Sequence, residues 1–407
     1  MENPFRYGSI VSGEYFVDRE QERAELELDM SSGQNVVLVS PRRYGKTSLV
    51  LTVARQLRSR GVLVAYLDLL ATPSKAQLAD GLATALYGDL VGFKDRTIHK
   101  VTEFFTKRSL QPRFSTSSDG TPSVELGLGE RAQDLDAALK RLLEIPGQIA
   151  EDQKKQVAVV LDEFQDARVI DEHLPSLIRS VWQMQPDVSH LFLGSQRHMM
   201  ESLFTSKAEP MYRMAKPMVL EPIRHDVFAA FIKSRFAATG REITDDAVDE
   251  ILKVTACQPH DTQELAHFTW TLAYIEQVVA TPRLVERALD RVVRAESARY
   301  TEAWIGLTKT QRLILSALAA SGGTSAIYSE SYRRQYGLGV HSTVQSSLKG
   351  LRENDLVEVV PPGEYRIPDP FLRSWLVRMT RPATGSGSIT AGPPTISASG
   401  TVDDPAI

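Results

Sequence analysis

The chain has 407 residues, of which 42% are hydrophobic and 24% charged, and this composition is typical of an ordinary globular protein with two or three domains. Its formal net charge of −4 argues against a chain dominated by non-specific nucleic-acid binding, although a local basic face stays open. The single cysteine, Cys257, excludes an internal disulfide and any metal cluster built on cysteines. No apolar run approaches the ~20 residues of a membrane span. The stretch MENPFRYGSI lacks the basic start and apolar centre of a signal peptide, so we expect a cytoplasmic protein.

The first predicted strand runs directly into a charged loop and then into a helix. Residues 36–39 are Val-Val-Leu-Val, and after the loop Leu49, Val53 and Leu57 repeat with the period of a helix. All but the first position of the loop match G-x-x-x-x-G-K-[ST], whose amides hold phosphates, whose lysine reaches the β- and γ-oxygens and whose hydroxyl binds Mg²⁺. A charged surface turn is the alternative, and the flanking strand and helix favour the phosphate loop. The loop residues are Ser40, Pro41, Arg42, Arg43, Tyr44, Gly45, Lys46, Thr47 and Ser48, with Ser40 in place of the first glycine.

Helical patterns separate four further strand-like runs. This alternation predicts an α/β fold with a parallel sheet and flanking helices. An alternating segment at 112–129, with Asp119-Gly120 at its centre, predicts an inserted β-hairpin, which is either a partner-binding edge or a plain surface excursion. The predicted strands are residues 62–68, 157–163, 190–195 and 217–223, and the predicted helices include 78–90 and 135–149.

The run VVLDEFQD supplies the carboxylates that hydrolysis needs beside a phosphate loop. Its four apolar residues end in Asp162 and Glu163. The strand is expected to hold Asp162 beside the loop, where it binds Mg²⁺ together with Thr47. Glu163 is expected to point elsewhere on the two-residue alternation of the strand and to polarise a water for attack on the γ-phosphate. Two acids that merely end a strand are the alternative.

The acid pair also predicts a strand order. When a catalytic glutamate follows the metal-binding aspartate, we expect another strand between the phosphate-loop strand and the acid strand. Here that strand is 190–195, and Ser195 at its end is then expected near the γ-phosphate, unless it simply ends the strand. Arg197 or Arg213 would neutralise charge in the transition state as an arginine finger, with a surface or structural role as the alternative for each.

The C-terminal part of the chain changes pattern twice. From Ile223 to about Ala298 it is all helical, and from Leu307 three helix-like stretches and two short strands predict a winged-helix module. The last 27 residues hold 16 Gly, Pro, Ser or Thr, so we expect disorder there. The predicted domains are a nucleotide-binding core at 1–222, a helical lid at 223–300, a winged helix at 301–380 and a tail at 381–407.

Seven stretches together are similar to one known family. They are NPFRYGSIVSGEYFVDREQE, SPRRYGKTSLV, VVLDEFQD, LFLGSQRHMM, PMYRMAKPMVLEPI, TACQPHDTQELAHFTW and YRIPDPFLRSWL. The combination resembles the archaeal-type ATPase family, in the STAND branch of the AAA+-related P-loop ATPases. The resemblance implies a doubly wound core that binds ATP and Mg²⁺, a helical lid and a winged helix.

The resemblance also implies roles for individual residues. Lys46 and Thr47 would contact the phosphates and the metal, Asp162 would be the metal carboxylate, Glu163 the base, and Pro259 a lid contact near the nucleotide. Two positions depart from the family pattern. One is Ser40, and the other is Cys257, which stands where the lid motif usually has glycine.

Two functions stay open. The first is a nucleotide-driven switch, in which hydrolysis moves the lid. The winged helix then reports the state to a partner, which is another protein or another copy, or it closes over the nucleotide as an internal lock. The second is a DNA-binding ATPase similar to origin-recognition initiators. A phosphotransferase is a third class, but nothing in the lid resembles an acceptor site. Helix 340–354 is polar and only modestly basic on its outer face, which favours the switch. That face offers His341, Ser342, Thr343, Gln345, Ser346 and Lys349, flanked by Arg333, Arg334 and Arg352.

Overall fold

The computed structural model describes residues 2–10, 16–91, 98–108, 110–116, 122–126, 132–360 and 362–380. The chain divides into two compact units, Met1–Arg299 and Tyr300–Ile407. The expected hairpin turn at Asp119-Gly120 and the expected disordered tail at 381–407 lie outside the described residues.

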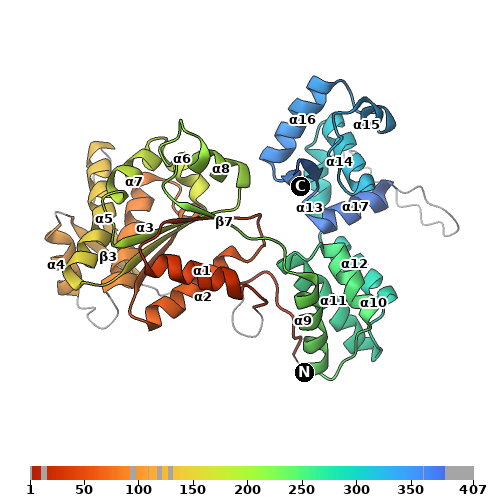
Figure 1. Cartoon of the computed structure of the whole chain (residues 1–407), viewed down its shortest axis with the longest axis horizontal. Helices are drawn as coiled ribbons and strands as arrows, with labels where there is room; N and C mark the ends of the chain where they lie inside the picture. Colours follow the sequence, from red (N-terminus) through yellow and green to blue (C-terminus); the bar gives the residue numbers. More distant parts are fainter. Residues whose placement is uncertain are drawn as a thin grey trace, which may run out of the picture. The chain divides into compact units, whose positions relative to one another are not determined.

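The first unit is built on a five-stranded parallel sheet with the strand order β2-β5-β6-β1-β7 (Figure 1). Strand β6 pairs with β1 on one side and with β5 on the other. The prediction that a strand separates the phosphate-loop strand from the acid strand is therefore confirmed. The strands are β1 (Val36–Val39), β2 (Leu63–Asp68), β5 (Val157–Asp162), β6 (Val188–Gly194) and β7 (Lys216–Val219).

Helices cover both faces of this sheet (Figure 1), which explains why every residue of β1, β5 and β6 is buried. The alternation of β5 divides its side chains between two cores. Ala158 and Val160 pack with helices α1 (Glu20–Ser31) and α2 (Lys46–Ser59). Val157, Val159 and Leu161 belong to the opposite core. The helices on that side include α3 (Lys75–Ala85), α5 (Ala132–Gln153), α7 (Leu174–Trp182) and α8 (Arg197–Thr205).

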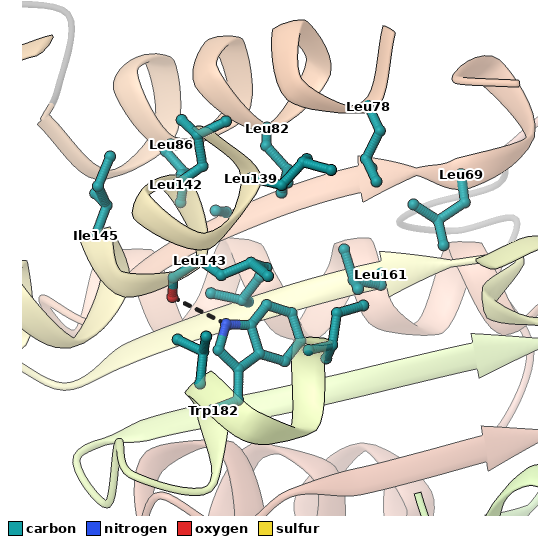
Figure 2. Packing of buried hydrophobic residues seen from close by; sticks show 14 of the residues in the cluster. Leu69, Leu78, Leu82, Leu86, Leu139, Leu142, Leu143, Ile145, Leu161 and Trp182 are labelled. Carbon is teal, nitrogen blue, oxygen red and sulfur yellow. Dashed lines mark hydrogen bonds between the residues drawn. The ribbon is translucent and has the colours of Figure 1, made fainter. Parts of the chain in front are cut away.

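Trp182 joins the helical layer to the sheet in this second core. Its indole N–H donates to the carbonyl oxygen of Leu143 at 3.0 Å, which ties α7 to α5 (Figure 2). Its ring also stacks on His190 of β6, with centroids 4.0 Å apart. His190 is completely buried, and its Nδ1 lies 3.1 Å from Oδ1 of Asn35. Burial lowers the pKa of His190 to about 3, so the imidazole is neutral in the folded core.

Two additions complete the first unit. Strands β3 and β4 form an antiparallel pair, and the backbone of Val124 bonds to the hydroxyl of Thr84 on α3. Helices α10, α11 and α12 pack against one another, and α9 packs on α10. The bounds are α4 (Ile98–Thr106), β3 (Pro112–Thr116), β4 (Pro122–Leu126), α6 (Ala167–Ile170), α9 (His225–Ala238), α10 (Asp245–Thr255), α11 (Pro259–Glu276) and α12 (Pro282–Ala295), with short helical turns at Leu69–Ala71, Leu86–Val91 and Phe164–Asp166. Helix α13 (Ser297–Ile305) begins in this unit and ends in the second.

The second unit has the predicted order of three helices followed by a two-stranded wing. Val344, Leu348 and Leu351 form the buried stripe of the third helix, as its sequence pattern predicts. A capping box at Thr308, closed by Gln311, starts the first helix. The elements are α14 (Lys309–Ser321), α15 (Glu330–Gln335), α16 (His341–Glu353), β8 (Glu358–Val360), β9 (Glu364–Arg366) and α17 (Pro370–Thr380). Across the described residues, no helix is both long and apolar enough to cross a membrane.

The buried imidazole predicts acid sensitivity of the first unit. The unfolded chain takes up a proton at His190 near pH 6.5, whereas the folded core resists protonation down to about pH 3. We expect the contribution of His190 to the free energy of unfolding to fall as the pH drops through this window. The variant His190→Phe keeps an aromatic ring against Trp182 and removes the titrating group. Urea unfolding at several pH values should show a weaker acid dependence for the variant, and an unchanged dependence would contradict the assignment.

Candidate active site

The loop between β1 and α2 is shaped by two left-handed residues. Arg43 has φ 69° and Gly45 has φ 81°, and Gly45 directly precedes the first turn of α2. Ser40 is completely buried, does not adopt a positive φ, and its N–H donates to the carbonyl oxygen of Gly194 at 3.4 Å. A side chain at the first position of the pattern is therefore tolerated, because the turn takes its unusual backbone conformation at the later positions.

Lys46 folds back over this loop. Its Nζ donates to the carbonyl oxygens of Ser40 at 2.9 Å and of Pro41 at 3.2 Å. Burial lowers the pKa of Lys46, while the carboxylates of Glu163 and Asp162 act in the opposite direction. The ammonium group thus lies inside the loop, as the sequence pattern requires of a phosphate-binding lysine.

Asp162 is the centre of the hydrogen-bond network at the carboxyl edge of the sheet. Its Oδ2 accepts from the hydroxyl of Thr47 at 2.9 Å and from that of Tyr66 at 2.6 Å, and its Oδ1 accepts from the N–H of Glu163 at 2.9 Å. Burial and the charge of Asp162 raise the pKa of Tyr66, so its hydroxyl stays protonated and donates. A hydroxyl and a carboxylate are the hard oxygen ligands that Mg²⁺ prefers, so Thr47 and Asp162 fit this metal.

Sequence reasoning missed Tyr66. The signal for it lies in the pairing of β2 with β5, which places Asp68 opposite Asp162 and Tyr66 opposite Val160. The sequence prediction did not place β2 beside β5, so it did not predict that the side chain of Tyr66 reaches Asp162.

Further carboxylates surround the network. Burial raises the pKa of Asp68, and so do the charges of Asp162 and Glu163. Burial likewise raises the pKa of Asp166, with Glu163 and Asp68 adding to the effect. The carboxyl edge is therefore a crowded negative site, and a bound cation would relieve it.

Glu163 lies beyond the end of β5 rather than on its alternation. Its backbone is left-handed, with φ 50°, so a turn and not the strand pleat directs the side chain. This corrects the expected placement. Its Oε2 accepts from the hydroxyl of Ser195 at 2.7 Å and from the amide of Gln165 at 2.5 Å. The structure thus brings Ser195 and Glu163 together, and it adds Gln165, which the sequence interpretation left out although it lies two residues along the same run.

The two candidate finger arginines bond elsewhere. Arg197 donates through Nε to Glu201 on α8 at 2.7 Å. Arg213 is exposed, has φ 55°, and its guanidinium lies 5.5 Å from the ring centre of Tyr212. None of these contacts reaches Lys46, Asp162 or Glu163, and a role of either arginine toward a second copy of the chain stays a prediction.

The start of α11 contacts the phosphate loop. Pro259 is the first residue of α11, and Cys257, two residues earlier, has φ 56°, a left-handed conformation that glycine adopts most easily. The buried carboxylate of Asp261 lies 3.6 Å from the guanidinium of Arg43 and 3.1 Å from Nδ1 of His260. This ion pair, which sequence reasoning missed, links the loop to the helix that carries Pro259.

Two family models match the chain. One is described as an ATPase domain predominantly from Archaea and matches residues 16–265, and the other is described as a probable winged helix domain and matches residues 298–378. A comparison with curated proteins finds no match.

Solved structures with the same fold include two archaeal proteins. The Walker-type ATPase PABY2304 of Pyrococcus abyssi is 17% identical, with 89% of this chain and 97% of that chain covered and a TM-score of 0.62. The ORC2 protein of Aeropyrum pernix, solved as ADPNP–ADP complexes, is 14% identical, with 92% and 98% covered and a TM-score of 0.55. At these identities the likeness establishes the fold, a parallel-sheet P-loop core with a C-terminal winged helix.

The start of α11 predicts a second pH dependence, opposite in sign to that of His190. Burial raises the pKa of Glu264 from its usual 4.5 to about 7, an effect that His260 opposes and Asp261 reinforces. The folded state therefore keeps a proton that the unfolded chain has lost, and the contribution of Glu264 to stability falls as the pH rises from 4.5 to about 7. We expect Glu264→Gln to unfold at a higher temperature than the wild type above pH 7, in thermal scans at matched pH. A variant that is equally or less stable there would contradict this assignment.

Proposed function

Because the chain belongs to the family of ATPase domains found predominantly in Archaea, we propose that it binds ATP with Mg²⁺ at the carboxyl edge of the sheet and hydrolyses it, acting in the cytoplasm as a nucleotide-dependent switch with the winged helix as its output. The observation that supports this most strongly is the pair of contacts from Thr47 to Asp162 and from Ser195 to Glu163. The first contact joins the two proposed metal ligands, and the second joins the proposed catalytic base to a hydroxyl at the same edge of the sheet.

Each side chain has a task in this proposal. The backbone N–H groups of the loop from Arg42 to Ser48 and the ammonium of Lys46 bind the phosphate oxygens. Thr47 and Asp162 hold Mg²⁺, which when bound neutralises charge on the phosphates. Glu163 accepts a proton from the attacking water, and Ser195 and Gln165 orient its carboxylate through their hydrogen bonds.

The proposed switch uses the contact between the phosphate loop and the lid. Arg43 belongs to the loop that would surround the phosphates, and its guanidinium lies 3.6 Å from Asp261 on α11. Nucleotide phosphates would compete with Asp261 for the guanidinium of Arg43. Binding of a nucleotide in the loop would therefore weaken the ion pair that links the loop to α11 of the lid. Pro259, two residues before Asp261, would move with it as the lid contact near the nucleotide.

A role for Arg213 or Arg197 as an arginine finger requires a second copy of the chain. Specific ATPase activity would then rise with protein concentration. The bond from Arg197 to Glu201 would have to break first, whereas the exposed Arg213 is open to a neighbour.

DNA binding is the second candidate, and the winged-helix fold is the observation that favours it. The side chains of this module give it less support. Lys349 lies 3.9 Å from Glu353 and Arg334 pairs with Glu330, so two of its exposed cations have acidic neighbours on their own helices. Arg333 bonds to the carbonyl oxygens of Tyr328 and Gly339. We therefore favour the switch.

Nucleotide affinity tests the phosphate loop. Lys46→Ala removes a charge-assisted bond to the phosphates, so ATP affinity should fall at least ~10-fold in calorimetry. The matched control is Lys75→Ala, because Lys75 pairs with Asp136 and Asp171 instead. Equal affinity of Lys46→Ala and wild type would refute the loop assignment.

Turnover tests the base. Glu163→Gln keeps the shape of the side chain but cannot accept a proton, so ATP should still bind while hydrolysis drops ~100-fold. Ser195→Ala, which removes only a bond to Glu163, should cost less. Glu172→Gln, at an exposed position before α7, is the matched control and should hydrolyse ATP at the wild-type rate. Full turnover by Glu163→Gln would move the catalytic role to another residue.

Salt dependence tests the second candidate. Motif geometry would place α16 in a major groove with Lys349 and Arg352 near phosphates. Such binding would weaken with salt at a logarithmic slope of about −0.9 per phosphate neutralised. We expect little DNA affinity at physiological salt, with ATP or with ADP. Tight, salt-sensitive binding that is abolished by the pair Lys349→Glu and Arg352→Glu would instead identify a DNA-binding ATPase.

A further inference from the structure

Three oxygens from three different elements meet beside the phosphate loop. The hydroxyl of Tyr66 on β2 and the hydroxyl of Thr47 on α2 both donate to the same oxygen, Oδ2, of Asp162 on β5. The bond from Tyr66, at 2.6 Å, is the shorter of the two. Tyr66 therefore contacts Oδ2 of Asp162, the same oxygen that bonds to Thr47, the other candidate metal ligand.

The position of Tyr66 is itself fixed by the helix that carries Thr47. The backbone N–H of Tyr66 donates to Oδ2 of Asp89 at 3.1 Å, and Asp89 pairs with Arg58 of α2 at 3.2 Å. Arg58 also donates to the carbonyl oxygen of Val64, two residues before Tyr66. Helix α2 thus contacts β2 through Arg58 at its C-terminal end and carries Thr47 in its first turn. The hydroxyls of Tyr66 and Thr47 are therefore held in a fixed position relative to each other.

Metal binding would affect the hydrogen bonds of Thr47 and Tyr66 to Asp162 differently. Thr47 is a candidate ligand and would turn its oxygen toward the metal, so its bond to Asp162 would be given up or weakened. The bond from Glu163 reaches only the other oxygen, Oδ1. Of the bonds to Oδ2 among the described residues, the one from Tyr66 is then left to keep the carboxylate from rotating.

We propose that Tyr66 is a positioning residue of the Mg²⁺ site, whose hydroxyl holds the carboxylate of Asp162 in the orientation that faces Thr47. This inference rests on the proposed function, since it concerns the same metal. Partners of this kind orient a ligand without touching the metal, and their removal typically weakens metal affinity ~10- to 100-fold.

The test compares nucleotide affinity with and without the metal. Calorimetry with a non-hydrolysable ATP analogue, in Mg²⁺ and separately in EDTA, gives the factor by which the metal tightens binding. Tyr66→Phe keeps the ring that packs beside α2 and removes only the hydroxyl. We expect its affinity in EDTA to match the wild type, whereas the Mg²⁺ factor falls ~10-fold. The matched control is Tyr87→Phe, at a buried tyrosine whose ring packs against Phe104 and Phe105.

Each other outcome overturns the inference in a recognisable way. An undiminished Mg²⁺ factor in Tyr66→Phe would show that the hydroxyl does not position the metal carboxylate. An equal loss in EDTA and in Mg²⁺ would assign Tyr66 to the shape of the loop instead. A wild-type protein that binds the analogue equally well with and without Mg²⁺ would refute the metal site itself, which is a failure of the proposed function.

Discussion

The hydrogen bond between Thr47 and Asp162 is the interaction on which the rest of the site depends. It joins the first turn of α2 to the end of β5, and between the strands that lead to these residues lies β6. Parallel strands all end at one edge of a sheet, so polar residues at their carboxyl ends meet there although they are far apart in the chain. Ser195 follows the intervening strand and bonds to Glu163 for the same reason.

The carboxylates at this edge of the sheet repel one another, and the contacts around them offset that repulsion. Asp68, Asp162, Glu163 and Asp166 share a partly buried edge, and like charges in such a setting repel strongly. Lys46 and the hydroxyl and amide donors around the carboxylates offset part of this repulsion. A bound Mg²⁺ would be the counter-ion of these carboxylates and of the phosphates of the nucleotide. The crowding of acids is thus consistent with a site that functions with a cation. Carboxylates that merely ended a strand would gain no stability from being crowded together.

Local sequence patterns predicted a large part of this arrangement. The apolar runs before Ser40 and before Asp162 predicted buried parallel strands, and the acid pair predicted the place of β6 between them. Those inferences rely on strand period and on general rules of α/β sheets, which hold without knowledge of particular contacts. The winged helix was predicted in the same way, from three helix-like stretches followed by two short strands.

The features that the sequence did not predict depend on long-range geometry. The bond from Tyr66 to Asp162 depends on the register of β2 against β5, and the ion pair of Arg43 with Asp261 depends on where α11 begins in space. The direction of the Glu163 side chain depends on its left-handed backbone conformation, with φ 50°. This conformation is unusual for glutamate, so the residue type does not predict it. The finger roles expected of Arg197 and Arg213 stay predictions, because the contacts of a single chain do not show what either side chain meets on a second copy.

A double-mutant cycle on Thr47 and Asp162 tests the central claim most directly. Thr47→Val and Asp162→Asn each preserve side-chain shape, and Mg²⁺-dependent ATP hydrolysis is measured for both variants and for their combination. If the two residues act as one metal-binding unit, the double variant should be little worse than the more damaged single variant. Losses that simply multiply would contradict the account, because they would show that Thr47 and Asp162 contribute independently.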